Sequence, residues 1–88
     1  MSQKVKIKLL FFGVAREMAE TSETELSIDA AWRTVNDLLS FICENYNLSA
    51  LKSFVALALD EEYLMEMKKP IVLEERSVLA LIPPVNGG

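Results

Sequence analysis

The sequence predicts a small α+β domain in which a mixed sheet of four or five strands packs on one long helix. Three observations predict this class: strict alternation at the start of the chain, one apolar stripe with helical spacing in the middle, and two nearly continuous apolar runs of strand length. The 88 residues suffice for one domain, and 51% of them are hydrophobic. We expect this domain to span residues 1–82, followed by an extended, flexible tail at residues 83–88.

The first strand is indicated by KVKIKLLFF, which covers residues 4–12. The alternation has the period of two that places successive side chains on opposite faces of a strand. One face would carry Val5, Ile7, Leu9 and Phe11, and the other Lys4, Lys6, Lys8, Leu10 and Phe12. Because the second face changes from lysine to apolar at Leu10, we expect this end of the strand to be covered on both faces, by the fold or by a partner.

A short helix and a second strand follow the first strand. Gly13 interrupts the alternation, and residues 15–20 are mostly good helix formers. Thr24, Leu26 and Ile28 then alternate loosely, which indicates a strand. Because so short a connection separates the two strands, we expect them to pair as neighbours.

The clearest helical pattern runs from Val35 to Tyr46. Its apolar stripe, with spacings of three and four residues, consists of Val35, Leu38, Leu39, Ile42 and Tyr46. Thr34 with Asp37 resembles a capping box, with Asp in place of the usual Glu, and Asp29 is an alternative start. The sequence therefore predicts one long helix in the middle of the chain.

The second half of the chain reads as three strands. FVALALD, residues 54–60, is nearly all apolar, so we expect a central strand buried on both faces. The acids at residues 60–62 would form a solvated turn into a short strand at residues 63–67. SVLALI, residues 77–82, would be the last strand, which Pro83 ends because proline cannot donate to a ladder. This order of elements is the ubiquitin-like β-grasp plan.

Composition excludes several functions. The chain has no histidine and a single cysteine, Cys43, so we expect no zinc site, no internal disulfide and no imidazole general base. Cys43 itself is expected to be a buried, inert thiol. The net charge of −4 argues against nucleic acid as the main partner, and no apolar run is long enough to span a membrane. Without a signal peptide in the sequence, we expect a cytoplasmic protein that is not an enzyme by itself.

The tail PPVNGG carries the most distinctive chemistry. Pro83 and Pro84 favour an extended exit from the domain, and Val85 offers one apolar contact. Gly87 and Gly88 lack a Cβ, so they can enter a slot too narrow for other residues, and four residues reach about 13 Å. The unhindered terminal carboxylate suits activation by ATP. A flexible end or a cloning remnant is the alternative, but two prolines directly after the last strand favour the functional interpretation.

The chain resembles the small, sulfur-carrier subunit of molybdopterin synthase, a β-grasp family. KLLFFGVAREM is similar to that family's first strand and helix, VALALDEEYL to its third and fourth strands, and VLALIPPVNGG to its last strand and tail. The Pro-Pro-Val-x-Gly-Gly ending is the specific part. Asn86 stands where the family often has Ser or Thr, and LEERSVLAL lacks a glycine turn often seen before the last strand.

The resemblance implies a mechanism and partners. An E1-like activating enzyme, using ATP and magnesium, would adenylate Gly88 and exchange the adenylate for sulfur. The resulting thiocarboxylate would donate sulfur to cyclic pyranopterin monophosphate inside a heterotetramer with the large synthase subunit, which would supply the catalytic side chains. The carrier would bind no cofactor or metal of its own. Phe12, Tyr63 and Ile82 occupy positions that face partner proteins in this family, with the core as their alternative place.

Two other functions stay open. One is a sulfur carrier for thiamine or for transfer-RNA thiolation, which would share the tail chemistry and differ in the acceptor. The other is a ubiquitin-like modifier, in which Gly88 would end on a lysine as an isopeptide.

Overall fold

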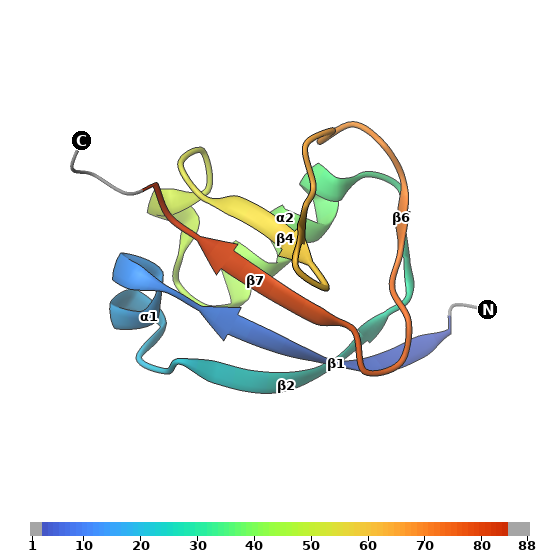
Figure 1. Cartoon of the computed structure of the whole chain (residues 1–88), viewed down its shortest axis with the longest axis horizontal. Coiled ribbons are helices and arrows are strands. Elements are labelled where there is room, and N and C mark those ends of the chain that lie inside the picture. Colours follow the sequence, from blue (N-terminus) through green and yellow to red (C-terminus); the bar gives the residue numbers. More distant parts are fainter. Residues whose placement is uncertain (1–2, 85–88) are drawn as a thin grey trace.

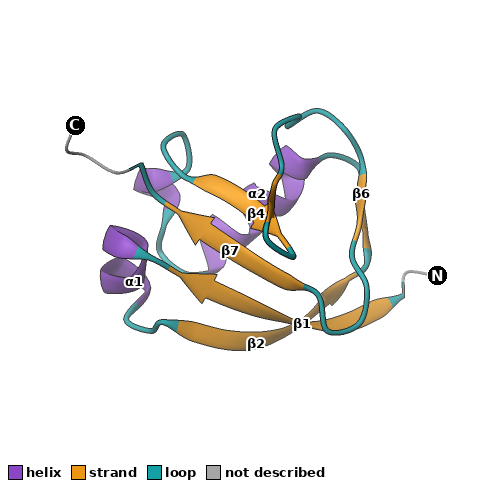
Figure 2. Ribbon diagram, in the orientation of Figure 1, coloured by secondary structure: helices purple, strands orange, loops and turns teal. Residues whose placement is uncertain are grey.

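The computed structural model describes residues 3–84 and shows an α+β fold in which a mixed five-stranded sheet has the order β2-β1-β7-β4-β5 (Figures 1 and 2). The sheet strands are β1 (Lys4–Phe11), β2 (Glu23–Asp29), β4 (Ala56–Leu59), β5 (Glu62–Tyr63) and β7 (Val78–Ile82). The other elements are α1 (Gly13–Ala19), β3 (Ala31–Trp32), α2 (Val35–Asn45), the 3-10 turn η1 (Ser49–Leu51) and β6 (Ile71–Val72). The α+β class and the five-stranded sheet are therefore as predicted.

The centre of the sheet joins the two ends of the chain. β1 pairs with β2 antiparallel, so the expected neighbour pairing of the first two strands is confirmed. On its other edge β1 pairs with β7 in parallel, with Lys8 opposite Val78 and Phe11 opposite Leu81. Because parallel strands run in one direction, β1 and β7 end at the same edge of the sheet. Figure 1 shows α1 and the end of β7 together at that edge.

Helix α2 covers one face of the sheet with the stripe that the sequence indicated. Its buried residues are Val35, Leu38, Leu39, Ile42 and Cys43. Thr34 is the N-cap, and its hydroxyl oxygen accepts a hydrogen bond from the Asp37 backbone N–H at 3.0 Å. Asp29 as an alternative start is wrong, because it is the last residue of β2. At 11 residues α2 is of average length, and the short α1 is present as predicted.

The structure corrects two strand predictions and adds two strands. The run at residues 54–60 forms β4, which lies inside the sheet between β7 and β5 as expected of a central strand, but its Ala56 is exposed, so it is not buried on both faces throughout. The strand expected at residues 63–67 is reduced to Glu62–Tyr63. The sequence interpretation also missed β3 and β6, which pair as a separate two-residue ribbon. Two residues are too few for a periodicity to be recognised.

The acidic turn at residues 60–62 has a structural role in addition to its exposure to solvent. Asp60 and Glu61 both have positive φ, +49° and +74°, in the tight connection between β4 and β5. The Asp60 carboxylate accepts a hydrogen bond from the Val78 backbone N–H at 2.9 Å, where β7 begins. Asp60 thus ties the turn to the central strand.

The helices of the described residues 3–84 are short, and none has the length and apolar character required to cross a membrane.

We predict that Thr34→Ala lowers the free energy of unfolding by about 1 kcal/mol, because the substitution removes the cap of the Asp37 N–H and leaves that donor without its side-chain partner. Urea denaturation followed by circular dichroism measures this change. Ser49→Ala is the matched control, since the cap of η1 is provided by no side chain and Ser49 itself is exposed. An unchanged midpoint for Thr34→Ala would show that the cap contributes nothing.

Candidate functional site

The sheet has one covered face and one open face. In β1 the residues Val5, Ile7, Leu9 and Phe11 are buried against the core, as the alternation predicted. The opposite face of β1 is exposed at its lysines and half-buried at Leu10. Phe12, which follows on the same face, is 46% exposed. The fold therefore leaves this apolar end of the first strand uncovered.

Strand register assembles an apolar row across the open face. Tyr63 pairs with Ala58, Ala58 with Ala80, and Ala80 with Leu10, so these four side chains point to the same side of the sheet. The two alanines in the middle are small, and the larger residues stand on either side. The result is a groove of about 290 Å³ lined by Leu10, Phe12, Ala58, Glu61, Tyr63, Val78, Ala80 and Ile82.

All three residues expected to face a partner line this groove. Phe12 lies at the start of α1, Tyr63 in the edge strand β5, and Ile82 at the end of the central strand β7. Tyr63 is 57% exposed and Phe12 46%, so neither is a core residue, while Ile82 is half-buried. The structure brings the three together on one surface, and their contact with a partner stays a prediction.

The groove lies beside the root of the tail. The Phe12 backbone N–H donates a hydrogen bond to the carbonyl oxygen of Leu81 at 3.2 Å, which joins the end of β1 to the end of β7. Gly13 has φ +55°, and a Cβ built there would stand 3.5 Å from Cγ of Pro83. Pro83 is half-buried in this corner, and Pro84 is exposed.

The remaining tail residues named from the sequence, Val85, Asn86, Gly87 and Gly88, lie outside the described residues. Within residues 3–84 the structure therefore locates the point from which the tail departs.

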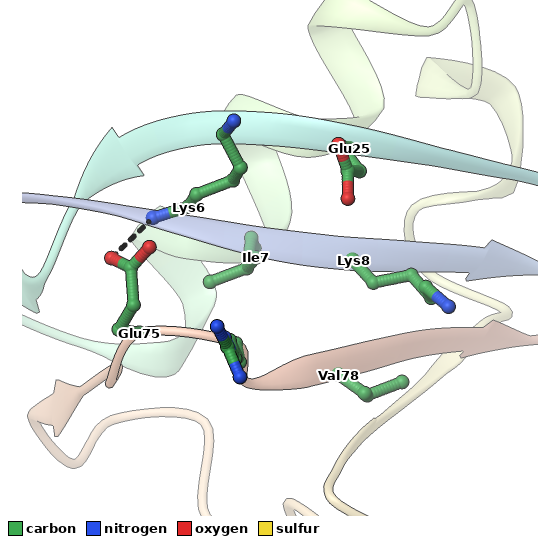
Figure 3. Close-up of a pocket in the computed structure, with 7 residues that line it drawn as sticks. Lys6, Ile7, Lys8, Glu25, Glu75 and Val78 are labelled. Atoms are coloured by element: carbon green, nitrogen blue, oxygen red, sulfur yellow. Dashed lines mark hydrogen bonds between the residues drawn. The ribbon is translucent and has the colours of Figure 1, made fainter.

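The other end of the open face is charged. Lys6, Lys8, Glu25, Glu75 and Arg76 line a polar cleft of about 510 Å³ there, with Val78 between this cleft and the groove (Figure 3). The Glu75 carboxylate accepts a hydrogen bond from the Lys6 backbone N–H at 3.0 Å. Since acids and cations alternate, the lysines do not form a patch of a single sign, and the expected solvated strand face describes them well.

Cys43 is fully buried in α2, as predicted. Burial raises the pKa of its thiol above the ordinary value, and the nearby Lys52 offsets this effect only in part. The thiol therefore stays protonated and poorly nucleophilic. Within residues 3–84, no three His, Cys, Asp or Glu side chains cluster in a way that could hold a metal ion.

Sequence reasoning missed the residues that make the groove hollow. Ala58 and Ala80 were treated only as parts of apolar strands, and Glu61 only as part of a solvated turn. The alternation of leucine with alanine in both ALAL and VLALI was the available indication. It places leucines on the helix-covered face and small residues on the other.

The family model described as "ThiS family" matches residues 9–88. The chain belongs to the ThiS family. Among curated relatives, a molybdopterin synthase sulfur carrier subunit from Anopheles gambiae is 38% identical over 88 residues, covering 99% of this chain and 97% of the relative. The resemblance stated from the three sequence segments is therefore confirmed, and it extends over nearly the whole length of this ThiS-family chain.

Solved structures confirm the ubiquitin-like β-grasp fold of this ThiS-family chain. It is similar to a chain in the complex of subunits 1 and 2 of molybdopterin-converting factor from Helicobacter pylori, with 25% identity, a TM-score of 0.62 and coverage of 96% and 100% of the two chains. It is also similar to small archaeal modifier protein 1 from Haloferax volcanii, with 20% identity, a TM-score of 0.71 and coverage of 94% and 99%. The second likeness concerns the fold alone.

We predict that iodoacetamide labels Cys43 of the native protein at most about one-hundredth as fast as it labels the unfolded chain, because the buried thiol is reached only through opening of the core. Mass spectrometry after timed quenching measures the rate, with the protein in concentrated guanidinium as the reference. Equal rates in the two conditions would place the thiol on an accessible surface.

Proposed function

We propose that this chain carries sulfur to molybdopterin synthase on the terminal carboxylate of Gly88. One observation carries the proposal: an apolar groove lies directly beside the root of a tail that ends in two glycines. A docking surface next to a thin, reactive end is what a carrier needs. The choice of molybdopterin synthase as the acceptor system is supported by the relatives from Anopheles gambiae, Drosophila yakuba and Aedes aegypti, which are molybdopterin synthase sulfur carrier subunits.

The first step activates the carboxylate. The Gly88 carboxylate oxygen attacks the α-phosphorus of ATP, and pyrophosphate leaves, giving an acyl-adenylate. A donor with sulfur at the oxidation level of sulfide then attacks the acyl carbon, and AMP leaves with the bonding electrons. The product is a thiocarboxylate in which one oxygen has been exchanged for sulfur. Magnesium and ATP are used by the E1-like enzyme and are not held by the carrier.

The second step delivers the sulfur. The thiocarboxylate sulfur forms a bond to a carbon of cyclic pyranopterin monophosphate and displaces an oxygen substituent of that carbon, which leaves with the bonding electrons. Water then hydrolyses the acyl–sulfur bond, which returns the Gly88 carboxylate and leaves the sulfur on the pterin. A dithiolene contains two sulfur atoms, and each carrier has one terminus, so two charged carriers are consumed for each pterin. The chain has no histidine, and in this proposal the side chains that transfer protons come from the large subunit.

The fold of the carrier supports both steps because it holds the start of the tail in place. Pro83 is half-buried against Gly13, so the tail begins from a supported corner, and Pro84 continues its extended direction. The four residues that follow reach about 13 Å at full extension. In this proposal, that reach brings Gly88 into a partner's active site while the groove stays in contact with the same partner's surface.

The partners in this proposal are the large synthase subunit, in a heterotetramer, and the E1-like activating enzyme. The Helicobacter pylori neighbour is a complex of subunits 1 and 2 of molybdopterin-converting factor, which supports a large-subunit partner. We place the reaction in the cytoplasm because the single cysteine gives no disulfide and suits a reducing compartment. The chain is then a carrier subunit of an enzyme and performs no catalysis alone.

We predict that deletion of Gly88 abolishes sulfur transfer without changing stability, because β7 ends at Ile82 and the core lies before the tail. The unaltered chain, incubated with ATP, magnesium, a sulfide source and the activating enzyme, should gain the mass of one oxygen-to-sulfur exchange. Intact-protein mass spectrometry measures this gain, and the Gly88 deletion variant should show none. Molybdopterin formation by the deletion variant would contradict the proposal.

The acceptor is tested by offering the same thiocarboxylate to three systems: the pterin precursor with the large subunit, a thiazole-forming system and a transfer-RNA thiolating system. Sulfur in the pterin is the expected result. Sulfur in either of the other products, but not in the pterin, would show that the pterin is not the acceptor. The chain would still be a sulfur carrier. A stable lysine conjugate without any thiocarboxylate would indicate a protein modifier.

We predict that Phe12→Asp and Tyr63→Asp each weaken binding to the large subunit by roughly tenfold or more, since aromatic side chains anchor interfaces of about 1,200 Å² or larger. Both side chains are exposed, so circular dichroism should stay native. Isothermal titration calorimetry measures the affinity. Val72→Asp is the matched control, because Val72 is 66% exposed in β6 and does not line the groove. Loss of the fold in both variants would place these residues in the core.

A further inference from the structure

The floor of the groove consists of two alanines at positions where larger side chains would fill it. Ala58 and Ala80 are paired across β4 and β7, and each is flanked in register by a larger residue, Tyr63 on one side and Leu10 on the other. On the covered face of the same two strands, Leu57 pairs with Leu81 and fills the core. The groove therefore results from the small side chains on the open face and not from the shape of the backbone.

The size of the hollow restricts what can occupy it. Its volume is about 290 Å³, roughly twice that of an engineered apolar cavity of about 150 Å³ that accepts benzene. One large side chain of an aromatic residue, leucine or methionine therefore fits with room for its backbone. The groove is open to solvent at the rim, where Phe12 and Tyr63 are both exposed, so a side chain of another protein can enter it.

One wall of the groove carries a free negative charge. Among the described residues 3–84 that line it, Glu61 is the only charged one. Within the part of the chain that the structure describes, the Glu61 carboxylate takes part in none of the salt bridges or side-chain hydrogen bonds, whereas Asp60 beside it is held by the Val78 N–H. Lys8, in the next row of the sheet, is paired with Glu23 at 3.7 Å. Glu61 thus remains available for a cation of a partner.

We propose that the groove takes one bulky apolar side chain of the large subunit, flanked in that subunit by a lysine or arginine that pairs with Glu61. This inference rests on the proposed function and specifies the partner's surface. Apolar burial would supply most of the affinity, and the ion pair would fix which way the partner lies across β7. Because the tail departs at the end of β7, this orientation also sets the direction in which the tail enters the partner.

Filling the groove from its floor tests the apolar part. Ala80→Leu should weaken the affinity for the large subunit by roughly tenfold or more, because the new side chain occupies the space of the partner's residue. Ala80→Val, which fills less and suits a strand, should give a smaller loss in the same direction. Ala31→Leu in β3 is the matched control, an exposed strand alanine outside the groove, and should bind within about twofold of the unaltered chain.

Charge changes test the ion pair with Glu61, and crosslinking tests which residues of the partner enter the groove. Glu61→Lys should weaken binding by roughly tenfold at low salt and less at high salt, while Glu62→Lys, beside it but outside the groove lining, should change affinity much less. With p-benzoylphenylalanine in place of Tyr63, irradiation of the complex should attach a peptide of the large subunit that contains a bulky apolar residue near a lysine or arginine.

The outcomes separate this inference from the function on which it rests. If the unaltered carrier binds the large subunit and both Ala80 variants, shown to be folded by thermal melting, bind equally well, the inference is wrong and the proposed function stands. A crosslinked peptide without a cation, together with no effect of Glu61→Lys, overturns the ion pair. Failure of the unaltered carrier to bind the large subunit overturns both.

Discussion

The parallel pairing of β1 with β7 is the constraint on which the rest of the structure depends. It brings the first and last strands of the described chain together at the centre of the sheet, with Leu10 opposite Ala80 and Phe11 opposite Leu81. Because both strands run in one direction, the corner at Phe12 and Gly13 forms next to the root of the tail. The groove and the root of the tail at Pro83 are thereby placed side by side.

The two faces of the same sheet differ: one forms the core, and the other carries the groove. On the covered face the leucines of β4 and β7 pack with the apolar stripe of α2, and Leu57, Leu79 and Leu81 are buried. Burial of such side chains is the main source of stability in a domain of this size. On the open face, Ala58 and Ala80 are small, Leu10, Val78 and Ile82 are half-buried, and Phe12 and Tyr63 are exposed. Alternation along a strand makes this division possible within five residues.

The structural features that depend on periodicity could be predicted from the sequence. The alternation from Val5 to Phe11 and the stripe of α2 gave both core faces, and Thr34 was placed correctly as the cap. The position of β7 at the centre could not be predicted in this way, because the runs of β4 and β7 are equally apolar and strand order is decided by pairing across the whole chain. Nor does any local pattern mark β3 and β6, which exist only because Trp32 meets Ile71 across the fold.

The residues of the candidate site could be predicted only from the resemblance to the sulfur-carrier family. Phe12, Tyr63 and Ile82 come from three separate elements, and no spacing in the sequence connects them. Their meeting in one groove follows from strand order and register, as does the emptiness above Ala80. The tail could be interpreted directly, because its chemistry lies in its own residues. Its four last members are outside the described part of the chain, so its role rests on the proposal.

The central place of β7 also has a consequence for synthesis. Contacts between residues distant in sequence form late, since a long loop must close before they contribute. Here the strand at the centre of the sheet is formed by residues 78–82, which the ribosome makes after every other strand of the sheet. While they remain inside the exit tunnel, β1 and β4 have no neighbour between them. We therefore expect the sheet to stay incomplete until residues 78–82 have left the tunnel, and a product that stops short of β7 to be open to proteolysis.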